Sequence, residues 1–364
     1  MITASFPDLA RAVRLLGTVP RRVPVPILAA ARLTGHGDVA TLETFDYDTG
    51  AAVDFPIQGG PAVPSTVLLD RAILARALKS PGGTPVTRRA WRVTIDGAVL
   101  SFPTGATVDA GHPGVAADFP ALPAGFTTRA TVDRDTLATA AGPAAVCASP
   151  IVAALPILEA ARVTVGNGQI VALATDRYRL ADTAAGPADG DLVALIPARW
   201  LAASAKLLGP GPVAISTDGR GHVALEQDGA RLFATLVEGD YPRAVEAIAD
   251  TAADSPVRFT ADRRALLEAT RGAIAATGKN EPVGLELDGH ALNVTAGAST
   301  WKIMVDGHGP WEGAFNPTFL RDALATLTGE RVVLRQAMPT NSFPKAASIT
   351  AAGPARFTIQ PIRL

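Results

Sequence analysis

Apolar residues fall on one face of a helix near the start of the chain and again near residue 270, as in amphipathic helices. The positions are Leu9, Val13 and Leu16 in the first segment and Leu266, Leu267 and Ile274 in the second. In all, six helices are predicted over residues 6–17, 69–79, 132–141, 197–208, 261–277 and 316–327. Three of them follow a proline, Pro64, Pro197 or Pro317, which is common at helix N-termini.

Short β-patterned runs lie between these helices. Residues 90–95 and 97–102 alternate as strands do, and Asp96-Gly97 between them favours a tight hairpin turn. The pattern therefore predicts an α+β module in which two helices pack on antiparallel strands.

The chain repeats itself. The segment Pro-Ile-Leu-Ala-Ala-Ala-Arg-Leu at 26–33 returns as Pro-Ile-Leu-Glu-Ala-Ala-Arg-Val at 156–163, and Thr-Val-Asp-Arg at 131–134 returns as Thr-Ala-Asp-Arg at 260–263. The spacing between the two copies of each segment is far too long for a solenoid repeat. We therefore expect three α+β domains, 1–124, 125–253 and 254–364.

Composition alone argues against a simple polybasic nucleic-acid binder. The 364 residues include 33 Lys plus Arg and 34 Asp plus Glu, a net charge of −1. The 48% hydrophobic content is ample for packed cores. The single cysteine, Cys147, fits a reducing, cytoplasmic setting, and the sequence predicts no membrane association.

Enzymatic signatures are missing from the sequence. There is no phosphate-binding Gly-x-x-x-x-Gly-Lys-Ser/Thr loop and no zinc-binding His-Glu-x-x-His helix. Asp46-Tyr47-Asp48 could suggest a cation site, but a turn fits better because the rest of a calcium loop is absent. We predict a protein that is not an enzyme and has no cofactor or metal.

Two segments carry a resemblance. These are Ala-Thr-Asp-Arg-Tyr-Arg-Leu-Ala at 174–181 and the chain end Pro-Ile-Arg-Leu at 361–364. With the threefold repeat and the length, they resemble the bacterial DNA polymerase III β subunit, the sliding clamp, whose members typically read Ala-Thr-Asp-Gly-His-Arg-Leu-Ala and end in Pro-Met-Arg-Leu. The resemblance implies three clamp domains that form half of a closed ring.

The resemblance also implies the function. Two subunits would close into a homodimer that encircles double-stranded DNA without sequence specificity. The ring would tether DNA polymerase III through a peptide-binding cleft, and the clamp loader would bind at that cleft too. The protein would thus be a non-catalytic processivity factor of DNA replication. An alternative is a divergent paralogue, a regulatory or resistance-associated binding module with altered dimerisation and an altered peptide cleft.

Sorting the charges by element changes the picture that composition gave. The six predicted helices hold twelve basic and seven acidic residues, a balance of +5, against −6 for the rest of the chain. This sign suits a DNA-encircling ring. With Arg22, which matches a family position near DNA, the expected DNA-facing residues are Arg11, Arg14, Arg22, Arg71, Arg76, Lys79, Arg199, Lys206, Arg263, Arg264, Arg271 and Arg321.

The second implied site is a partner-peptide cleft between the middle and last domains, an apolar slot for Leu and Phe side chains of a short extended peptide. By resemblance it comprises Leu158, Thr175, Tyr178, Arg179, Leu180, Pro242, Ala247, Phe319, Pro361, Ile362, Arg363 and Leu364. Plain core packing is the alternative for Leu158, Leu180 and Ile362.

The chain departs from the family pattern in both places. Arg177 and Tyr178 stand where glycine and histidine are usual, and Gln360 stands where methionine is usual. At the expected subunit interface, residues 107–112 lack the usual arginines and large apolar residues, and Ala275 replaces a larger side chain. We therefore expect altered peptide preference and altered ring closure.

Overall fold

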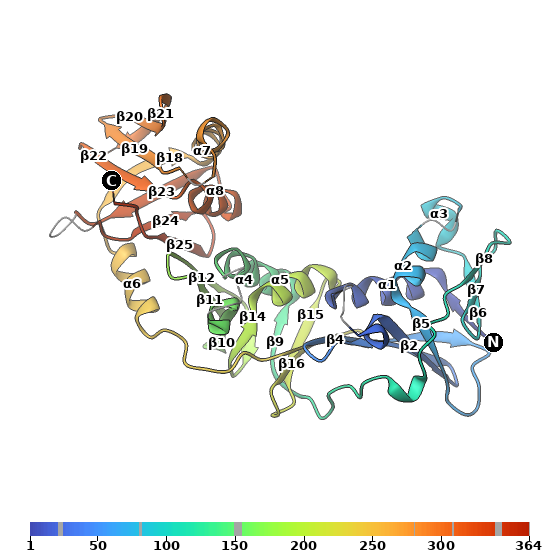
Figure 1. Cartoon of the computed structure of the whole chain (residues 1–364). Helices are drawn as coiled ribbons and strands as arrows, with labels where there is room; N and C mark the ends of the chain where they lie inside the picture. Colours follow the sequence, from blue (N-terminus) through green and yellow to red (C-terminus); the bar gives the residue numbers. More distant parts are fainter. Residues whose placement is uncertain are drawn as a thin grey trace. The chain divides into compact units, whose positions relative to one another are not determined.

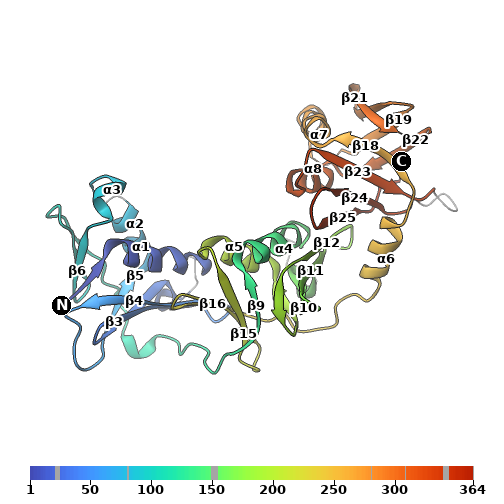
Figure 2. The ribbon, with the colours of Figure 1, turned by 180° about the vertical axis from the view of Figure 1, so that it is seen from behind.

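The computed structural model describes residues 1–20, 25–79, 82–148, 155–279, 281–307, 309–338 and 344–363. It divides into two compact units (Figures 1 and 2). Unit 1 comprises Met1–Arg134 and Ala203–Leu236, and unit 2 comprises Asp135–Ala202 and Val237–Leu364. In the described part of the chain, no helix is long and apolar enough to cross a membrane.

The element order repeats three times, as the sequence predicted. Each repeat runs strand, helix, four strands, helix, three strands, with one short extra strand, β13, in the second repeat. The strands of the first repeat are β1 (Ile2–Ser5), β2 (Ala30–His36), β3 (Val39–Phe45), β4 (Thr49–Gln58), β5 (Ser65–Asp70), β6 (Arg92–Asp96), β7 (Val99–Ser101) and β8 (Thr107–Asp109). Those of the second are β9 (Thr127–Asp133), β10 (Ala160–Gly166), β11 (Gln169–Thr175), β12 (Arg179–Ala185), β13 (Ala188–Gly190), β14 (Leu192–Pro197), β15 (Pro212–Thr217), β16 (His222–Gln227) and β17 (Ala230–Thr235). Those of the third are β18 (Val257–Asp262), β19 (Val283–Asp288), β20 (Ala291–Ala296), β21 (Ser299–Gly307), β22 (Trp311–Phe315), β23 (Arg331–Gln336), β24 (Ala347–Ala351) and β25 (Ala355–Ile359).

All six predicted helices form. They are α1 (Phe6–Leu15), α2 (Arg71–Lys79), α4 (Arg134–Cys147), α5 (Ala198–Leu207), α7 (Arg263–Thr277) and α8 (Pro317–Thr326). Their starts follow from capping: the Ser5 hydroxyl accepts from Asp8 N–H, the Asp262 carboxylate from Ala265 N–H at 2.7 Å, and the Asn316 amide oxygen from Thr318 N–H at 2.9 Å.

Two predicted helix boundaries are wrong. Helix α4 continues to Cys147, beyond the predicted end at residue 141. Residues Ser65–Asp70 form strand β5, and helix α2 begins only at Arg71. The Asp70 carboxylate accepts from Ile73 N–H at 2.8 Å and so marks the true start. Pro64 therefore precedes a strand. The apolar run before Asp70 fits the helical period as well as the strand period. Its pairing with β2 makes it a strand.

Two further helices, α3 (Pro85–Arg88) and α6 (Ala244–Ala253), were not predicted. Both lie in segments that connect the repeated elements. The second is important because it forms one wall of the candidate site described below.

The sheet of unit 1 runs through a junction between two repeats. Its strand order includes β15-β16-β17-β4-β1-β6-β7-β8, and β17 pairs with β4 from Ala230↔Val53 to Ala234↔Thr49. The hairpin predicted at Asp96-Gly97 joins β6 to β7. Helices α1 and α2 pack against each other beside this sheet (Figure 1).

The sheet of unit 2 contains the corresponding junction. Its order is β14-β10-β11-β12-β25-β24-β23-β18-β21-β20-β19-β22, and β12 pairs with β25 from Arg179↔Ile359 to Thr183↔Ala355. In both units, the third strand after the first helix of one repeat therefore pairs with the last strand of the next repeat. We call these two strand pairs, β4–β17 and β12–β25, the seams.

Two strand edges lack the partner that this rule assigns. Among the described strands, β8 ends the unit 1 sheet and pairs with β7 alone, so its outer edge lacks a seam partner. Strand β21 pairs with β18 only through Val305–Gly307, so the stretch 299–303 has β20 on one side and no described strand on the other. In the threefold repeat, β21 corresponds to β4 and β12, and β8 corresponds to β17 and β25. The two open edges therefore correspond to the two strands that pair in a seam.

Candidate functional site

A small apolar cluster in unit 2 lies between sheet and helix. Leu173 on β11 and Leu180 on β12 pack with Val245 and Ala249 on α6, and the half-buried Tyr241 packs against all four. The Tyr241 hydroxyl donates to the Leu173 carbonyl at 3.3 Å, which fixes the ring at the entrance to α6. Burial raises the pKa of Tyr241 above its ordinary value, so the ring stays neutral.

Helix α6 is held over the sheet by ion pairs along its length. Near its start Glu246 pairs with Arg162 of β10 at 2.5 Å. Near its end Asp250 pairs at 2.9 Å with Arg356 of β25, which also pairs with Asp182 of β12. The hydrogen bond to Asp182 raises the pKa of Arg356 and outweighs burial, which lowers it. The Arg356 side chain therefore stays charged.

Arg179 connects β12 to helix α8. Its guanidinium pairs with Asp176 at 3.0 Å and with Asp322 at 2.9 Å, and it stacks over the Phe319 ring with 4.4 Å between Cζ and the centroid. Only 9% of the side chain is exposed. Burial by itself lowers the pKa of Arg179, but the neighbouring Cys147 and the carboxylates of Asp322 and Asp176 outweigh burial, and the net pKa is raised. The buried Cys147 lies near this cluster with its pKa raised by burial, which leaves an unreactive thiol.

The turn before Arg179 is a tight Asx turn with unusual residues at its tip. The Asp176 carboxylate accepts from Tyr178 N–H and Arg179 N–H, and the Thr175 hydroxyl accepts from Arg177 N–H at 3.0 Å. Arg177 has φ +80°, the left-handed region, which explains why glycine suits this position. Tyr178 is 64% exposed and stands beside the cluster.

The first repeat has the same turn. Its Asp46 carboxylate accepts from Asp48 N–H and Thr49 N–H, and Tyr47 has φ +76°. The turn predicted at Asp46-Tyr47-Asp48 is therefore confirmed.

An open groove of about 420 Å³ runs beside α6 in unit 2. It is mostly apolar, and α6 contributes mainly small side chains to its wall. The lining residues are Ala244, Ala247, Ile248, Thr251, Ala252, Ser255, Ala337, Pro344, Lys345, Ala346 and Gln360. Gln360 also ties the groove to the turn, since its backbone N–H donates to the Tyr178 carbonyl at 2.8 Å.

Many of the predicted cleft residues meet around this groove and the apolar cluster. Leu180 is in the cluster, Ala247 lines the groove, Pro242 accepts from Val245 N–H at the start of α6, and Phe319 stacks on Arg179. Thr175 belongs to the turn. We call the groove with this cluster the cleft.

The remaining predicted cleft residues belong neither to the groove lining nor to the apolar cluster. Leu158 is buried on a single turn of 3₁₀ helix, Pro156–Glu159, that contacts β11. Pro361 is buried, Ile362 N–H donates to the Ala314 carbonyl at 2.7 Å, and Arg363 is exposed. Leu364 lies outside the described residues.

Most of the predicted DNA-facing residues are exposed on helices. The exposed ones are Arg14, Arg76, Lys79, Arg199, Lys206, Arg264 and Arg271. Arg11, Arg263 and Arg321 are partly buried, and each has a partner: Arg11 donates to the Asp228 carbonyl, Arg263 to the Gly329 and Leu324 carbonyls, and Arg321 pairs with Asp322. Arg22 lies outside the described residues.

Arg71 does not fit the DNA-facing set. It is 7% exposed, and its guanidinium donates to the Pro20 and Ala29 carbonyls inside unit 1. Its charge therefore holds the segment that leads into β2, and we omit it from the proposed DNA surface. Sequence spacing placed it on the helix but gave no indication that the first helical residue turns inward.

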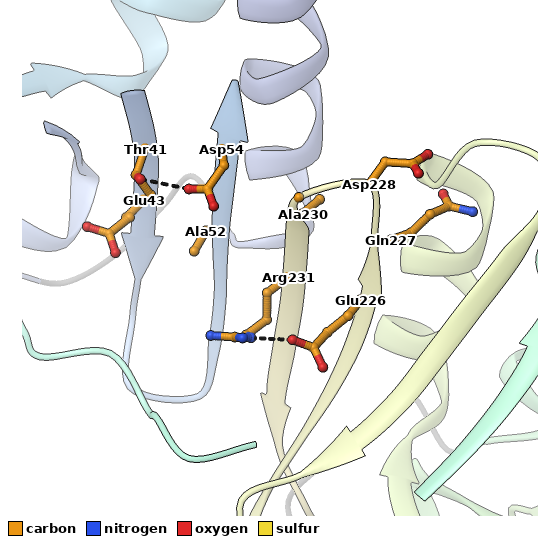
Figure 3. Close-up of a pocket in the computed structure, with 10 residues that line it drawn as sticks. Thr41, Glu43, Ala52, Asp54, Glu226, Gln227, Asp228, Ala230 and Arg231 are labelled. Carbon is orange, nitrogen blue, oxygen red and sulfur yellow. Dashed lines mark hydrogen bonds and ion pairs between the residues drawn. The ribbon is translucent and has the colours of Figure 1, made fainter. Parts of the chain in front are cut away.

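The pocket at the seam of unit 1 has the opposite electrostatic character. Figure 3 shows Glu43 and Asp54 from strands β3 and β4 opposite Glu226 and Asp228 at the β16–β17 hairpin. Arg231 pairs with Glu226 at 2.7 Å. This excess of carboxylates disfavours phosphate, so the pocket does not belong to the DNA surface.

The segment expected at the subunit interface is only partly available for pairing. Ala110 is buried, and the His112 ring hydrogen-bonds the Pro26 carbonyl at 3.0 Å, so residues 110–112 are anchored within unit 1. Thr107–Asp109 is the open edge β8. In unit 2, Ile274 is half-buried and Ala275 is exposed at the end of α7.

Comparisons with known proteins agree on one family. The family model described as DNA polymerase III beta subunit, central domain, matches residues 131–243. The "Beta sliding clamp" of Micrococcus luteus is 31% identical over 76% of this chain and 87% of its own length. The "Beta sliding clamp homolog GriR" of Streptomyces muensis is 30% identical over 84% and 82%. The crystal structure of the DNA polymerase III beta subunit from Thermotoga maritima covers 100% of both chains with a TM-score of 0.84 at 15% identity, which shows the shared fold.

Proposed function

The chain belongs to the bacterial β sliding clamp family, the β subunits of DNA polymerase III, and we propose that it closes around duplex DNA as a homodimeric ring and tethers a polymerase. It acts as a binding protein and performs no catalysis. Its work is carried out at three places: the open strand edges, the basic helices and the cleft.

The observation that carries this proposal is the pair of open edges. The seam rule assigns β21 a partner in a following repeat and β8 a partner in a preceding repeat, and the described part of the chain pairs neither edge in this way. A second copy supplies both, because its β8 meets β21 and its β21 meets β8. Head-to-tail pairing of this kind is the heterologous contact that generates closed rings.

The exposed basic residues on the helices form the DNA surface. Arg264 and Arg271 lie seven residues apart, hence on one face of α7, and both are exposed. Lysine and arginine without base-reading geometry hold phosphates and leave the ring free to slide. The proposed set comprises the exposed Arg14, Arg76, Lys79, Arg199, Lys206, Arg264 and Arg271, together with the partly buried Arg11, Arg263 and Arg321 and with Arg22.

The cleft receives short peptides of partner proteins, among them DNA polymerase III and the clamp loader. Ala247 and the exposed Ile248 of α6 offer an apolar surface beside the buried Leu180 cluster, and the exposed Tyr178, on the turn that Arg179 holds, orients the peptide. Burying two large apolar side chains contributes roughly 3–6 kcal/mol before ordering costs. We assign this role also to Leu158, Thr175, Pro242, Ala247, Phe319, Pro361, Ile362, Arg363 and Leu364.

Sedimentation equilibrium followed by DNA retention tests the proposal. A dimer of twice 37.4 kDa is expected, and clamp-loader-assisted retention on nicked circular DNA should disappear when the circle is linearised. Binding that survives linearisation with unblocked ends would mean that the chain does not encircle DNA. A chain that stays monomeric at micromolar concentration would rule out the proposed homodimeric ring.

A divergent paralogue is the second candidate, and specific residues favour it. Arg177, Tyr178 and Gln360 alter the cleft, while Thr107–Asp109 and Ala275 offer little apolar area to a second subunit. A relative named a clamp homolog is also about as similar as the clamps are. A monomer that binds peptides but is not retained on circular DNA would support this reading over the first.

The domain boundaries and the location belong to the same proposal. The repeated element order supports three clamp domains, 1–124, 125–253 and 254–364, each beginning before its first strand. A DNA-bound processivity factor of a bacterium works in the cytoplasm. Limited proteolysis that cuts near residues 124 and 253 first would support the boundaries.

A further inference from the structure

We propose that Trp301 is the anchor by which the chain recognises a second copy of itself, with the indole entering a pocket beside β8 of that copy. This inference rests on the proposed homodimeric ring. It adds the side chain that decides which subunits can pair, since strand edges alone would pair with little selectivity.

Trp301 lies in the open stretch 299–303 of β21 and is half-buried. It shares a face of the strand with the buried Ile303, because residues two apart point to the same side. The indole rests against helix α7 at Gly272, where a Cβ atom would lie only 2.8 Å from the indole Cε2. Glycine at this position therefore makes room for the ring at the open edge.

The repeat fixes the position to which Trp301 corresponds. Val294 and Leu42 are each the fourth residue of their strands, β20 and β3. Trp301 pairs with Val294, and Val53 of β4 pairs with Leu42. Trp301 therefore takes the place of Val53, which pairs with Ala230 of β17 across the seam of unit 1.

The same comparison identifies the residue that Trp301 faces. Val108 of β8 and Leu232 of β17 pair with the equivalent leucines of β7 and β16. Ala106 and Ala230 lie two residues before them and therefore correspond. Pairing of two copies in the register of the seam places Trp301 of one copy opposite Ala106 of the other.

Ala106 lines a pocket of about 440 Å³ in unit 1. The pocket is apolar apart from one guanidinium, and arginine stacks well on an indole face. Its lining residues include Ile73, Arg76, Ala77, Phe102, Ala106 and Val108. A tryptophan brings a large apolar area to such a contact, which the short strand β8 lacks.

The third repeat differs from the first in the sizes of two neighbouring residues. Tryptophan replaces Val53 on the strand, and Gly272 replaces Leu15 on the helix, counted from the capping residue of each helix. A subunit with larger side chains at positions 106 and 108 would fill the pocket and exclude the indole. The contact therefore favours a second copy of this chain over such subunits.

Sedimentation equilibrium of the full-length protein tests the anchor. Trp301→Ala removes the indole, and Ala106→Phe fills the pocket from an exposed position while Trp301 is kept. Both should weaken the dimer roughly 30-fold or more, as loss of a buried tryptophan anchor does. Met304→Ala is the control, since Met304 is exposed on the other face of β21, and it should dimerise like the wild type.

Mixing the two defective variants tests whether Trp301 meets this pocket. A head-to-tail dimer of one Trp301→Ala chain and one Ala106→Phe chain has one intact contact, because the first keeps the pocket and the second keeps the indole. The equimolar mixture should therefore dimerise more tightly than either variant alone. Circular dichroism verifies that both variants are folded.

The outcomes separate this inference from the proposed ring. If the wild type dimerises and both variants do so with the wild-type constant, the ring stands and Trp301 is not its anchor. A mixture no tighter than its components would show that Trp301 and the pocket do not meet. If the wild type is itself a monomer, the proposed ring fails together with the anchor.

Discussion

Arg179 combines two carboxylates and an aromatic ring in one nearly buried position. The guanidinium of β12 neutralises Asp176 in its own turn and Asp322 on α8, and Phe319 covers it. A buried ion pair adds little net stability when complete, but removing one partner leaves uncompensated charge. The residue therefore holds the turn beside the cleft in place as well as contributing to its surface.

Arg179→Met should destabilise unit 2 by about 3–5 kcal/mol, because two carboxylates lose their shared cation. Urea unfolding followed by circular dichroism measures the change. Arg177→Met is the matched control, since that side chain is exposed, and it should stay within about 0.5 kcal/mol of wild type. Equal loss in both variants would show that the turn, and not the ion pairs, matters.

Asp218 gives a pH-dependent contribution to the stability of unit 1. Burial raises its pKa, but hydrogen bonds from Arg220 N–H, His222 N–H and the His222 ring outweigh burial and hold the pKa below its usual 3.8. A carboxylate with a depressed folded pKa stabilises above its unfolded pKa, and the contribution is lost as pH falls through the folded value.

The free energy of unfolding should therefore decline on acidification below about pH 4 partly through Asp218. Urea midpoints of wild type and Asp218→Asn, measured between pH 3 and pH 7, provide the comparison. Asp218→Asn should be less stable at pH 7, and the gap should narrow as pH falls. A gap that is constant with pH would rule out the linkage.

Helix α6 is the element that sequence reasoning missed and the site most needs. Its residues, 244–253, are rich in alanine, and no helix was predicted there. Tertiary ion pairs fix the helix, because Glu246 and Asp250 pair with arginines on strands that lie far away in sequence. A pattern within the segment cannot reveal such partners.

Arg356→Met should weaken peptide binding to the cleft by about tenfold, because α6 loses the cation that anchors Asp250 and positions the groove wall. Fluorescence anisotropy with a labelled Leu-Phe peptide measures the affinity. Arg331→Met removes an exposed pair with Asp306 on the same sheet and should leave affinity unchanged. Wild-type affinity in Arg356→Met would mean that α6 keeps its position without this tie.

The helices were predictable because their signals are local. Ser5, Asp262 and Asn316 cap helices through side chains three residues or fewer from the amides they serve. The cleft could be anticipated only in part, by resemblance, since Leu180 and Val245 meet through tertiary packing. The inward turn of Arg71 depends on carbonyls of another segment and has no local signal.

At the scale of the whole molecule, the near-neutral total charge conceals an uneven distribution of positive and negative side chains. Helices α1, α2, α5 and α7 each carry exposed arginines or lysines, whereas the seam pocket of unit 1 carries carboxylates. A ring that slides needs attraction to phosphate along one surface and none elsewhere. The net charge of −1 therefore says little about the partner.

Arg264→Gln with Arg271→Gln should lower duplex DNA affinity and reduce the slope of log K against log salt by about 1.8, the loss of two phosphate contacts. Anisotropy with a labelled duplex at several salt concentrations gives the slope. Arg129→Gln with Arg220→Gln is the control, because both residues are exposed away from the helices. A slope unchanged in the α7 variant would remove that helix from the DNA surface.

The open edges also expose the chain to a hazard before a partner arrives. Each newly made subunit carries one edge of each kind, β8 and β21, and a heterologous contact can add copies indefinitely as well as close on itself. Whether the product is a finite ring or a growing filament depends on the rotation between successive subunits. Any substitution that changes the geometry of a seam could therefore convert a soluble clamp into a polymer without weakening a single strand contact.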